Sequence, residues 1–281
     1  MFGEILAMRR LAAAAVAALC VHGTAMAAQG DLDNLVTARL LAEPTALAPG
    51  GEAWLAVELS MKPGWHTYWR NPGDSGQPTA INWILPKNYR AGAIHWPVPR
   101  QIPAGIGVSY GYADTVALLV PLIVPKLAQT GAQVEIAATV EWLVCKEICV
   151  PGEVRLSLKL PVAVSAPPDT AAKTLFDKAR AALPAELAAP AKGKAGESAL
   201  VLELPDETLK GIAAPQAVFM PFDDTLIDHA APQTLKGATL ALKRGQVQGK
   251  PPAETGGLLL VEDKAGGISR AYNLSVQFKT E

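Results

Sequence analysis

Short apolar runs alternate with turn-forming residues along most of the chain, and this pattern predicts β-strands rather than helices. Between positions 35 and 164 the runs are separated by clusters of glycine, proline, asparagine and aspartate. The predicted strands cover residues 36–41, 53–59, 65–69, 79–85, 116–124, 133–144 and 154–160. No helical period interrupts them, so we predict an antiparallel, immunoglobulin-like β-sandwich over residues 28–164.

Residues 97–112 fit neither the strand pattern nor a short turn. The stretch is rich in proline and glycine and ends in the sequence Tyr110-Gly111-Tyr112. It is too long for a simple hairpin connection, and long loops in compact domains are often functional. We therefore predict an irregular functional loop here.

The second half of the chain begins with a different pattern. Residues 171–183 have helical spacing, with Asp169 or Thr170 as the cap and Pro184 as the end. Small residues at 190–196 then indicate a linker, so residues 165–196 are predicted to be a helix and linker. Strand patterns return at 199–204, 216–221, 238–243, 257–261 and 272–278. The fold class is thus all-β, with a second, smaller immunoglobulin-like β-sandwich at residues 197–281 joined to the first by the helix and linker.

The first 27 residues have the pattern of a secretory signal peptide. Arg9 and Arg10 precede the apolar run 11–21, and Ala25-Met26-Ala27 forms an A-x-A cleavage signature. No other apolar run reaches 18 residues, so we expect an exported protein that does not insert into the membrane. The net charge of −1 comes without a basic stripe, which argues against nucleic acid as a partner.

Cys145 and Cys149 carry the candidate chemistry, because the third cysteine, Cys20, lies inside the predicted signal peptide. A bridge between them closes a loop of about five residues, which by the chain-entropy estimate stabilises the fold by only about 2 kcal/mol. The residues leave three interpretations open. The pair forms a structural disulfide, a reversible redox couple, or a Cu(I) site built from two soft thiolates.

Metal ligands other than these two thiolates are hard to find in the sequence. Asp223, Asp224, Asp228 and His229 share one loop but lack a regular ligand spacing, so we interpret them as solvated loop residues. The remaining histidines show no paired spacing either. We therefore expect no cofactor and no metal, with Cu(I) at Cys145 and Cys149 as the alternative.

The surroundings of the cysteines resemble a known family. The chain resembles the N-terminal periplasmic domain of the DsbD family of thiol:disulfide interchange proteins, most closely its ScsB-like (suppressor of copper sensitivity) branch. Unlike many members of the family, it is expected to lack transmembrane and thioredoxin-like domains. The motifs that carry the resemblance are Lys62-Pro63-Gly64-Trp65-His66-Thr67-Tyr68-Trp69, Tyr110-Gly111-Tyr112-Ala113-Asp114 and Trp142-Leu143-Val144-Cys145-Lys146-Glu147-Ile148-Cys149-Val150-Pro151.

The resemblance implies a periplasmic, immunoglobulin-like domain that relays electrons through Cys145 and Cys149. The implied donor is a membrane-embedded DsbD- or ScsB-like protein, and the implied acceptors are oxidised periplasmic proteins of the thioredoxin fold. It also implies a cap loop over the active site, for which the stretch 97–112 is the candidate. By position, Cys149 is the cysteine that would form the intermolecular link.

Five aromatic residues fall where the family lines its active site: Trp65, Tyr68, Tyr110, Tyr112 and Trp142. For Trp65 and Tyr68, ordinary core packing is an equally good interpretation. Two alternatives to the redox relay remain at this stage. One is a copper-binding or copper-tolerance module that uses Cys145 and Cys149, and the other is a structural interaction module with an inert disulfide.

Overall fold

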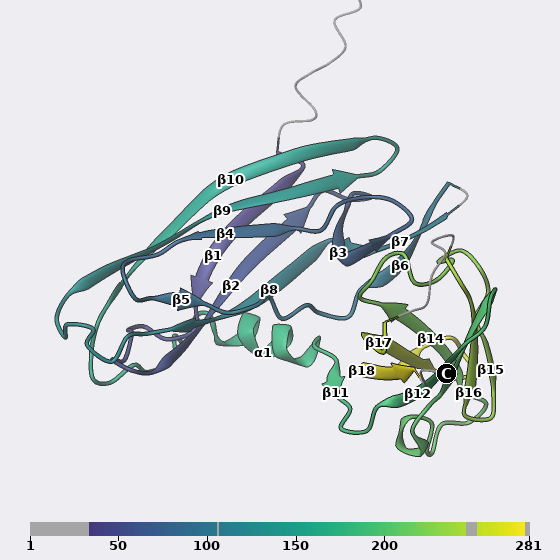
Figure 1. Cartoon of the computed structure of the whole chain (residues 1–281). Coiled ribbons are helices and arrows are strands. Elements are labelled where there is room, and N and C mark those ends of the chain that lie inside the picture. Colours follow the sequence, from purple (N-terminus) through teal and green to yellow (C-terminus); the bar gives the residue numbers. More distant parts are fainter. Residues whose placement is uncertain (1–33, 106, 246–251, 279–281) are drawn as a thin grey trace, which may run out of the picture. The chain divides into compact units, whose positions relative to one another are not determined.

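The described part of the chain is almost wholly β-structure, which confirms the all-β prediction (Figure 1). The computed structural model describes residues 34–105, 107–245 and 252–278. The predicted signal peptide, residues 1–27, lies outside these residues. In the described part, no helix has both the length and the apolar character needed to cross a bilayer.

Two sheets form the N-terminal β-sandwich. The four-stranded sheet has the order β1 (Val36–Ala42), β2 (Glu52–Met61), β8 (Thr115–Ile123), β5 (Arg90–Ala91). The six-stranded sheet has the order β10 (Cys149–Pro161), β9 (Gln133–Cys145), β3 (His66–Gly73), β7 (Gly107–Ala113), β6 (Arg100–Ala104), and β4 (Ala80–Ile84) also pairs with β9. The immunoglobulin-like sandwich predicted from the strand pattern is therefore confirmed.

The main hydrophobic core lies between these sheets, and a helix covers the outer face of the four-stranded one. Helix α1 (Lys173–Ala181) places Phe176 and Ala179 against Ala56 on β2 and Leu119 on β8. Strands β2 and β8 are consequently buried on both faces in their middle, which explains their nearly continuous apolar sequences.

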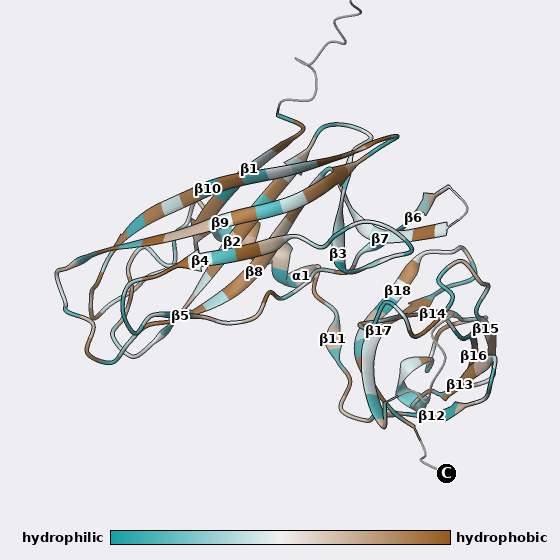
Figure 2. Cartoon of the chain, turned by 45° about the horizontal axis from the view of Figure 1, so that its top comes forward, coloured by the Kyte–Doolittle hydropathy of each residue, from teal (hydrophilic) through white to brown (hydrophobic). Residues whose placement is uncertain are grey.

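Strands β9 and β10 form a long hairpin that ends at the two cysteines. They pair without a break from Gln133 opposite Pro161 to Cys145 opposite Cys149. Along β10, exposed and partly buried residues alternate, and Figure 2 shows hydrophilic and hydrophobic residues alternating along this hairpin. The alternation fixes which face of the hairpin meets solvent, since neighbouring side chains on a strand point to opposite faces.

The C-terminal strands form a single curved sheet around their own core. Its order is β14 (Gln216–Pro221), β17 (Glu254–Glu262), β18 (Ile268–Phe278), β12 (Ala191–Ala195), β13 (Ala199–Glu203), β16 (Thr239–Lys243), β15 (Thr234–Lys236), with β11 (Ala185–Glu186) on β18 and the 3-10 helix η2 (Asp206–Thr208) in a connection. The side-chain amide of Gln233, next to β15, bonds both the N–H and the C=O of Phe219 on β14. The end strands of the sheet are thereby joined.

The predicted linker at residues 190–196 is wrong in this structure, because most of it is strand β12. This strand pairs with both β13 and β18. Its small residues made it look like a linker, but they are needed for packing. A Cβ on Gly193 would lie only 2.5 Å from Cδ1 of Phe278, so a larger residue would not fit against that ring.

The irregular loop predicted at residues 97–112 is also wrong, because strands β6 and β7 form a hairpin there. Pro103 lies opposite Val108 within it. A proline is tolerated because β6 is the last strand of the sheet and needs no donor on its outer side. The proline and glycine content therefore marked an edge hairpin rather than a long loop.

Strand β3 also contacts the C-terminal sheet. The side-chain amide of Asn71, which is 1% exposed, donates to the carbonyl oxygen of Pro221 at 2.7 Å. Its Oδ1 accepts the N–H of Gly73 at 2.8 Å. Phe222 lies against the Trp69 ring and under the guanidinium of Arg70. These contacts fix the end of β3 and the start of the segment that follows it.

Asn71→Ala is expected to lower the free energy of unfolding, because it leaves the Pro221 carbonyl and the Gly73 N–H without their partner. Each buried group that loses its bond costs about 1–3 kcal/mol. Chemical denaturation of the variant and the native protein measures the difference. Asn82→Ala, at an exposed amide that bonds Glu141, is the matched control and should change stability by less than about 0.5 kcal/mol. Equal effects at the two positions would contradict the role given to Asn71.

Candidate functional site

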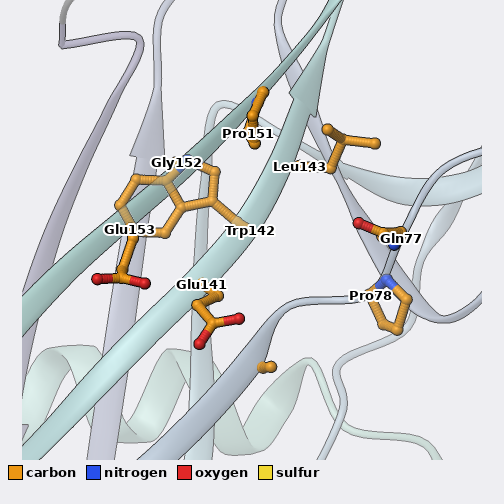
Figure 3. Close-up of a pocket in the computed structure, with 9 residues that line it drawn as sticks. Gln77, Pro78, Glu141, Trp142, Leu143, Pro151, Gly152 and Glu153 are labelled. Carbon is orange, nitrogen blue, oxygen red and sulfur yellow. The ribbon is translucent and has the colours of Figure 1, made fainter.

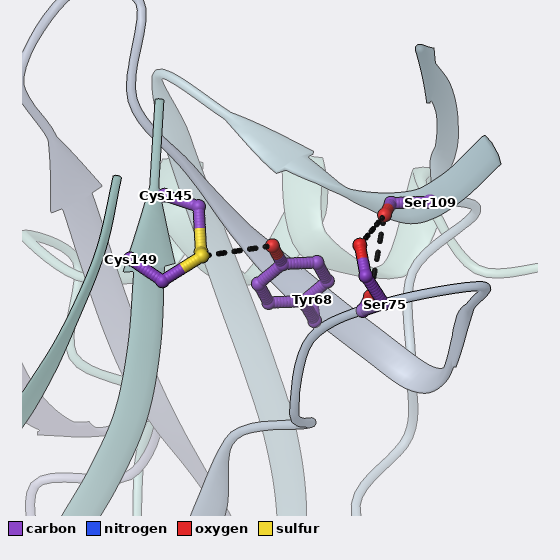
Figure 4. The surroundings of a disulfide bond; sticks show 5 residues. All are labelled: Tyr68, Ser75, Ser109, Cys145 and Cys149. Carbon is purple, nitrogen blue, oxygen red and sulfur yellow. Dashed lines mark hydrogen bonds between the residues drawn. A yellow bond between two sulfur atoms is a disulfide. The ribbon is translucent and has the colours of Figure 1, made fainter. Parts of the chain in front are cut away.

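Cys145 and Cys149 form a disulfide at the tip of the β9–β10 hairpin, next to its turn (Figure 4). Three exposed residues, 146–148, make the turn, and the N–H of Lys146 donates to the carbonyl of Ile148 at 3.0 Å. This tight turn places the cysteines directly opposite each other, with their Cα atoms 4.1 Å apart. Two cysteines four positions apart in the sequence therefore become direct neighbours across the hairpin.

The two cysteines differ in their access to solvent. Cys145 is 3% exposed, because β10 lies on one side of it and His66 of β3 pairs with it on the other. Cys149 belongs to the last strand of the sheet and is exposed. A thiolate approaching from outside therefore reaches residue 149 rather than residue 145.

Tyr68 is the aromatic residue that contacts the disulfide. Its hydroxyl lies 3.9 Å from Sγ of Cys149, while its ring is buried (Figure 4). Burial raises the pKa of Tyr68 above its ordinary value. The hydroxyl thus stays protonated at neutral pH and can donate a hydrogen bond to a thiolate at position 149.

A segment between β3 and β4 covers the Tyr68 ring. Gly76 packs so closely that a Cβ there would lie 2.2 Å from Cε1 of Tyr68. Ser75 is held by Ser109 of β7, whose hydroxyl lies 3.1 Å away, and Asp74 accepts the N–H of Val108 at 2.7 Å. We call residues 74–78 the cover segment, since it lies over the residue that touches Cys149.

His66 completes the immediate surroundings of the disulfide. It pairs with Cys145 across the sheet, and its ring centroid lies 5.2 Å from that of Tyr68. Burial lowers the pKa of His66 below its ordinary value, which favours the neutral imidazole. The environment of Cys145 is therefore apolar and uncharged on this side.

The lowered pKa of His66 predicts a loss of stability in mild acid. Below pH 6.5 the unfolded chain binds a proton at His66, whereas the folded protein does not yet bind it. The free energy of unfolding therefore decreases as the pH falls from 6.5 towards the lowered pKa of His66 in the folded state. His66→Gln should lose less stability than the native protein between about pH 7.5 and about pH 5.5. Urea denaturation at each pH measures this, and parallel pH profiles for the two proteins would contradict it.

Three of the other aromatic residues proposed as lining have their partners away from the disulfide. Tyr110 bonds Nδ1 of His229 at 3.0 Å, and Tyr112 donates to the carbonyl of Pro97 at 2.8 Å. Burial raises the pKa of both hydroxyls, and for Tyr110 the Asp74 carboxylate adds to the effect. Trp65 packs against the main core. Core packing accounts for these three positions, and a role in the site stays a prediction for them.

Trp142 lies on the rim of a depression next to the disulfide. The depression has a volume of about 500 Å³ and is lined by Gln77, Pro78, Ala80, Glu141, Trp142, Leu143, Pro151, Gly152 and Glu153 (Figure 3). The Trp142 ring lies across Gly152, where a Cβ would be 2.4 Å from Nε1. The glycine thus allows the indole to rest against β10.

Sequence reasoning missed the cover segment and assigned its role to residues 97–112. Those residues form the β6–β7 hairpin, whereas residues 74–78 contact Tyr68. The sequence Asn71-Pro72-Gly73-Asp74-Ser75-Gly76 signalled a loop, but strand β3 runs on to Gly73 and the connection begins only at Asp74. Nothing in it indicated that the loop folds back on Tyr68.

The aspartates near His229 serve structural roles. Asp223 caps the backbone of Thr225, Asp228 pairs with Lys243, and His229 bonds the carbonyl of Asp224. Within the described residues, no group of three or more histidine, cysteine or acidic side chains converges as a metal site would require. A Cu(I) site would therefore depend on Cys145 and Cys149 alone.

Comparison with known proteins gives two kinds of match. Residues 37–161 match a family model described as "Thiol:disulfide interchange protein DsbD, N-terminal". The solved N-terminal periplasmic domain of ScsB from Proteus mirabilis is similar over 88% of this chain and 95% of that chain, with 20% identity and a TM-score of 0.62. The reduced N-terminal domain of DsbD from Neisseria meningitidis matches 46% of this chain and 90% of that chain, with 12% identity and a TM-score of 0.24. No curated protein sequence matches.

Proposed function

We propose that this protein carries out thiol–disulfide exchange through Cys145 and Cys149, because residues 37–161 match the model of the DsbD N-terminal family. The observation that carries the proposal is the exposed Cys149 in a disulfide whose other half, Cys145, is buried. A redox couple needs one sulfur that a partner can reach and a second that can resolve the adduct. A purely structural bridge has no need of an exposed cysteine beside a buried tyrosine.

The exchange with an oxidised partner takes two steps. The Cys149 thiolate attacks one sulfur of the partner's disulfide, forms a mixed disulfide and releases the partner's other sulfur as a thiolate. The Cys145 thiolate then attacks Sγ of Cys149, and the partner's second sulfur leaves. The protein ends with the Cys145–Cys149 disulfide, and two electrons have passed to the partner.

Reduction of the Cys145–Cys149 disulfide by a reduced donor follows the same steps in reverse. A donor thiolate attacks Sγ of the exposed Cys149 and expels Cys145 as a thiolate. The donor's second thiol resolves the mixed disulfide and leaves both cysteines reduced. The Tyr68 hydroxyl, 3.9 Å from Sγ of Cys149, stabilises the thiolate that forms there before the attack on a partner.

The proposed setting is the periplasm, with a separate membrane-embedded reductase as the donor and oxidised periplasmic thiol proteins as acceptors. Support comes from the family match and from the similar fold of the ScsB domain, which is itself periplasmic. The predicted signal peptide is consistent with this compartment. No observation on the described residues favours the copper alternative over exchange.

The reduction potential of the Cys145–Cys149 pair tests the proposal against an inert bridge. Equilibration with glutathione buffers, followed by thiol labelling and mass spectrometry, gives the potential. An exchanging pair should have a potential above about −300 mV, whereas a structural bridge falls below that value. A potential well below this boundary would overturn the proposed function.

A further inference from the structure

The outward face of the β9–β10 hairpin carries three cross-strand pairs in a row. Starting from the tip they are the Cys145–Cys149 disulfide, Leu143 with Pro151, and Glu141 with Glu153. Residues two apart on a strand share a face, so these six side chains lie on one side of the hairpin. The three on β10 are all exposed, whereas the residues between them are partly buried.

The second and third of these pairs line the depression beside the disulfide. Gln77 and Pro78 border it on the opposite side (Figure 3), and Ala80 also lines it. Gln77 and Pro78 belong to the cover segment, which also contacts Tyr68. The depression therefore borders the segment that covers the proposed reactive site, and we call it the acidic groove.

The carboxylate pair at the far end of the acidic groove is unusual for a hairpin. Glu141 and Glu153 stand directly opposite each other, an arrangement that destabilises a sheet through charge repulsion. Asn82 donates to Oε1 of Glu141 at 2.8 Å and holds that carboxylate in place. Arg155 follows Glu153 on the same face, yet no ion pair within 4.0 Å joins it to either glutamate in the described part of the chain. The pair thus offers two negative charges to a visiting cation.

We propose that the acidic groove is the docking surface for an extended segment of the thiol partner, and that this segment carries a lysine or arginine four residues from its reactive cysteine. This proposal rests on the proposed function. Strands rise about 3.3 Å per residue, so four residues span about 13 Å. That is also the separation along the hairpin from Cys149 to Glu153. The cationic side chain meets the two carboxylates while Leu143 and Pro151 contact the residues between.

Peptide disulfides of opposite charge test the proposal. Each synthetic peptide carries one cysteine as a mixed disulfide with 5-thio-2-nitrobenzoate, and a lysine or a glutamate four positions before or after it. Reduced protein attacks the peptide sulfur and releases thionitrobenzoate, whose absorbance gives the rate. The Cys145 thiolate then frees the peptide thiol and completes the two-electron transfer.

The lysine peptide should react faster than its glutamate counterpart in at least one of the two positions. Exposed ion pairs change such rates by about two- to fivefold. The preference should shrink at high salt, because exposed charges are screened. Equal rates for the two peptides in both positions would overturn the proposal.

Removing the two negative charges of the acidic groove tests whether they cause the preference for the lysine peptide. The double variant Glu141→Gln/Glu153→Gln keeps the shape of both side chains and should abolish the preference for lysine. Glu135→Gln is the matched control, since Glu135 is exposed on the same strand near its other end and should leave the preference intact. A preference that persists in the double variant would contradict the assignment of the site.

A neutral reagent separates failure of docking from failure of exchange. Bis(2-hydroxyethyl) disulfide has no charge for the acidic groove to recognise, so it should oxidise the native protein and the double variant at equal rates. If it reacts but the peptides are not distinguished, docking is refuted and exchange stands. If the reduced protein reacts with no disulfide at all, the proposed function fails as well.

Discussion

Cys149→Ser is expected to reduce thiol–disulfide exchange to the uncatalysed background, whereas Cys145→Ser should lose turnover but keep the first step. The difference follows from burial, because Cys149 is exposed and Cys145 is only 3% exposed. With Cys149 alone, the reduced protein still forms a mixed disulfide but has no resolving thiol. With Cys145 alone, the remaining sulfur is out of reach of a partner.

Reaction of each reduced variant with bis(2-hydroxyethyl) disulfide measures this difference. Mass spectrometry should detect a rapidly formed adduct on Cys145→Ser and a slow one on Cys149→Ser. Both variants should remain folded, since a bridge across so short a loop stabilises the fold by only about 2 kcal/mol. Equal adduct rates would contradict the assignment of Cys149 as the attacking residue.

Gly76→Ala is expected to have the second largest effect, because it displaces the cover segment from Tyr68. Its Cβ would lie 2.2 Å from the Tyr68 ring, and its φ of +107° is one that residues with a side chain rarely adopt. Such strain costs about 1–3 kcal/mol. The variant should be less stable, and small thiols should reduce its disulfide faster, because the displaced Tyr68 ring no longer packs beside Sγ of Cys149.

Gly131→Ala is the control that distinguishes the effect of backbone strain from the effect of displacing the cover segment from Tyr68. Gly131 also has a positive φ, +85°, but no atom lies within 4 Å of its would-be Cβ. Gly131→Ala should therefore lose stability without any change in the rate at which dithiothreitol reduces the disulfide. If Gly76→Ala leaves that rate unchanged as well, residues 74–78 do not protect the disulfide through Tyr68.

The strands and the position of the cysteine pair follow from the sequence for clear physical reasons. Apolar runs bounded by turn residues predicted most strands, since a half-buried sheet requires alternation and its connections require glycine and proline. The cysteines fall between the predicted strands 133–144 and 154–160, and the structure places them at the tip of the hairpin that β9 and β10 form. The match of residues 37–161 to the family agrees with the motifs around Trp142 and Tyr112.

The contacts around the disulfide depend on features that a sequence does not specify. Tyr68 reaches Cys149 because His66 pairs with Cys145, and a shift of one residue in that register would turn Tyr68 to the other face. The cover segment is anchored through Asn71, whose partner Pro221 is 150 positions away in the sequence. Such long-range pairing is decided by tertiary packing. The sequence therefore did not show that residues 74–78 lie over Tyr68, and the covering loop was predicted at residues 97–112 instead.

Trapping of mixed disulfides on Cys149 tests the central claim most directly. Cys145→Ser, produced in the periplasm, is quenched with acid and alkylated, and its adducts are identified by mass spectrometry. We predict covalent adducts of periplasmic thiol proteins joined to Cys149, and none with the Cys145→Ser/Cys149→Ser control. A folded Cys145→Ser protein that forms no adducts would contradict the claim.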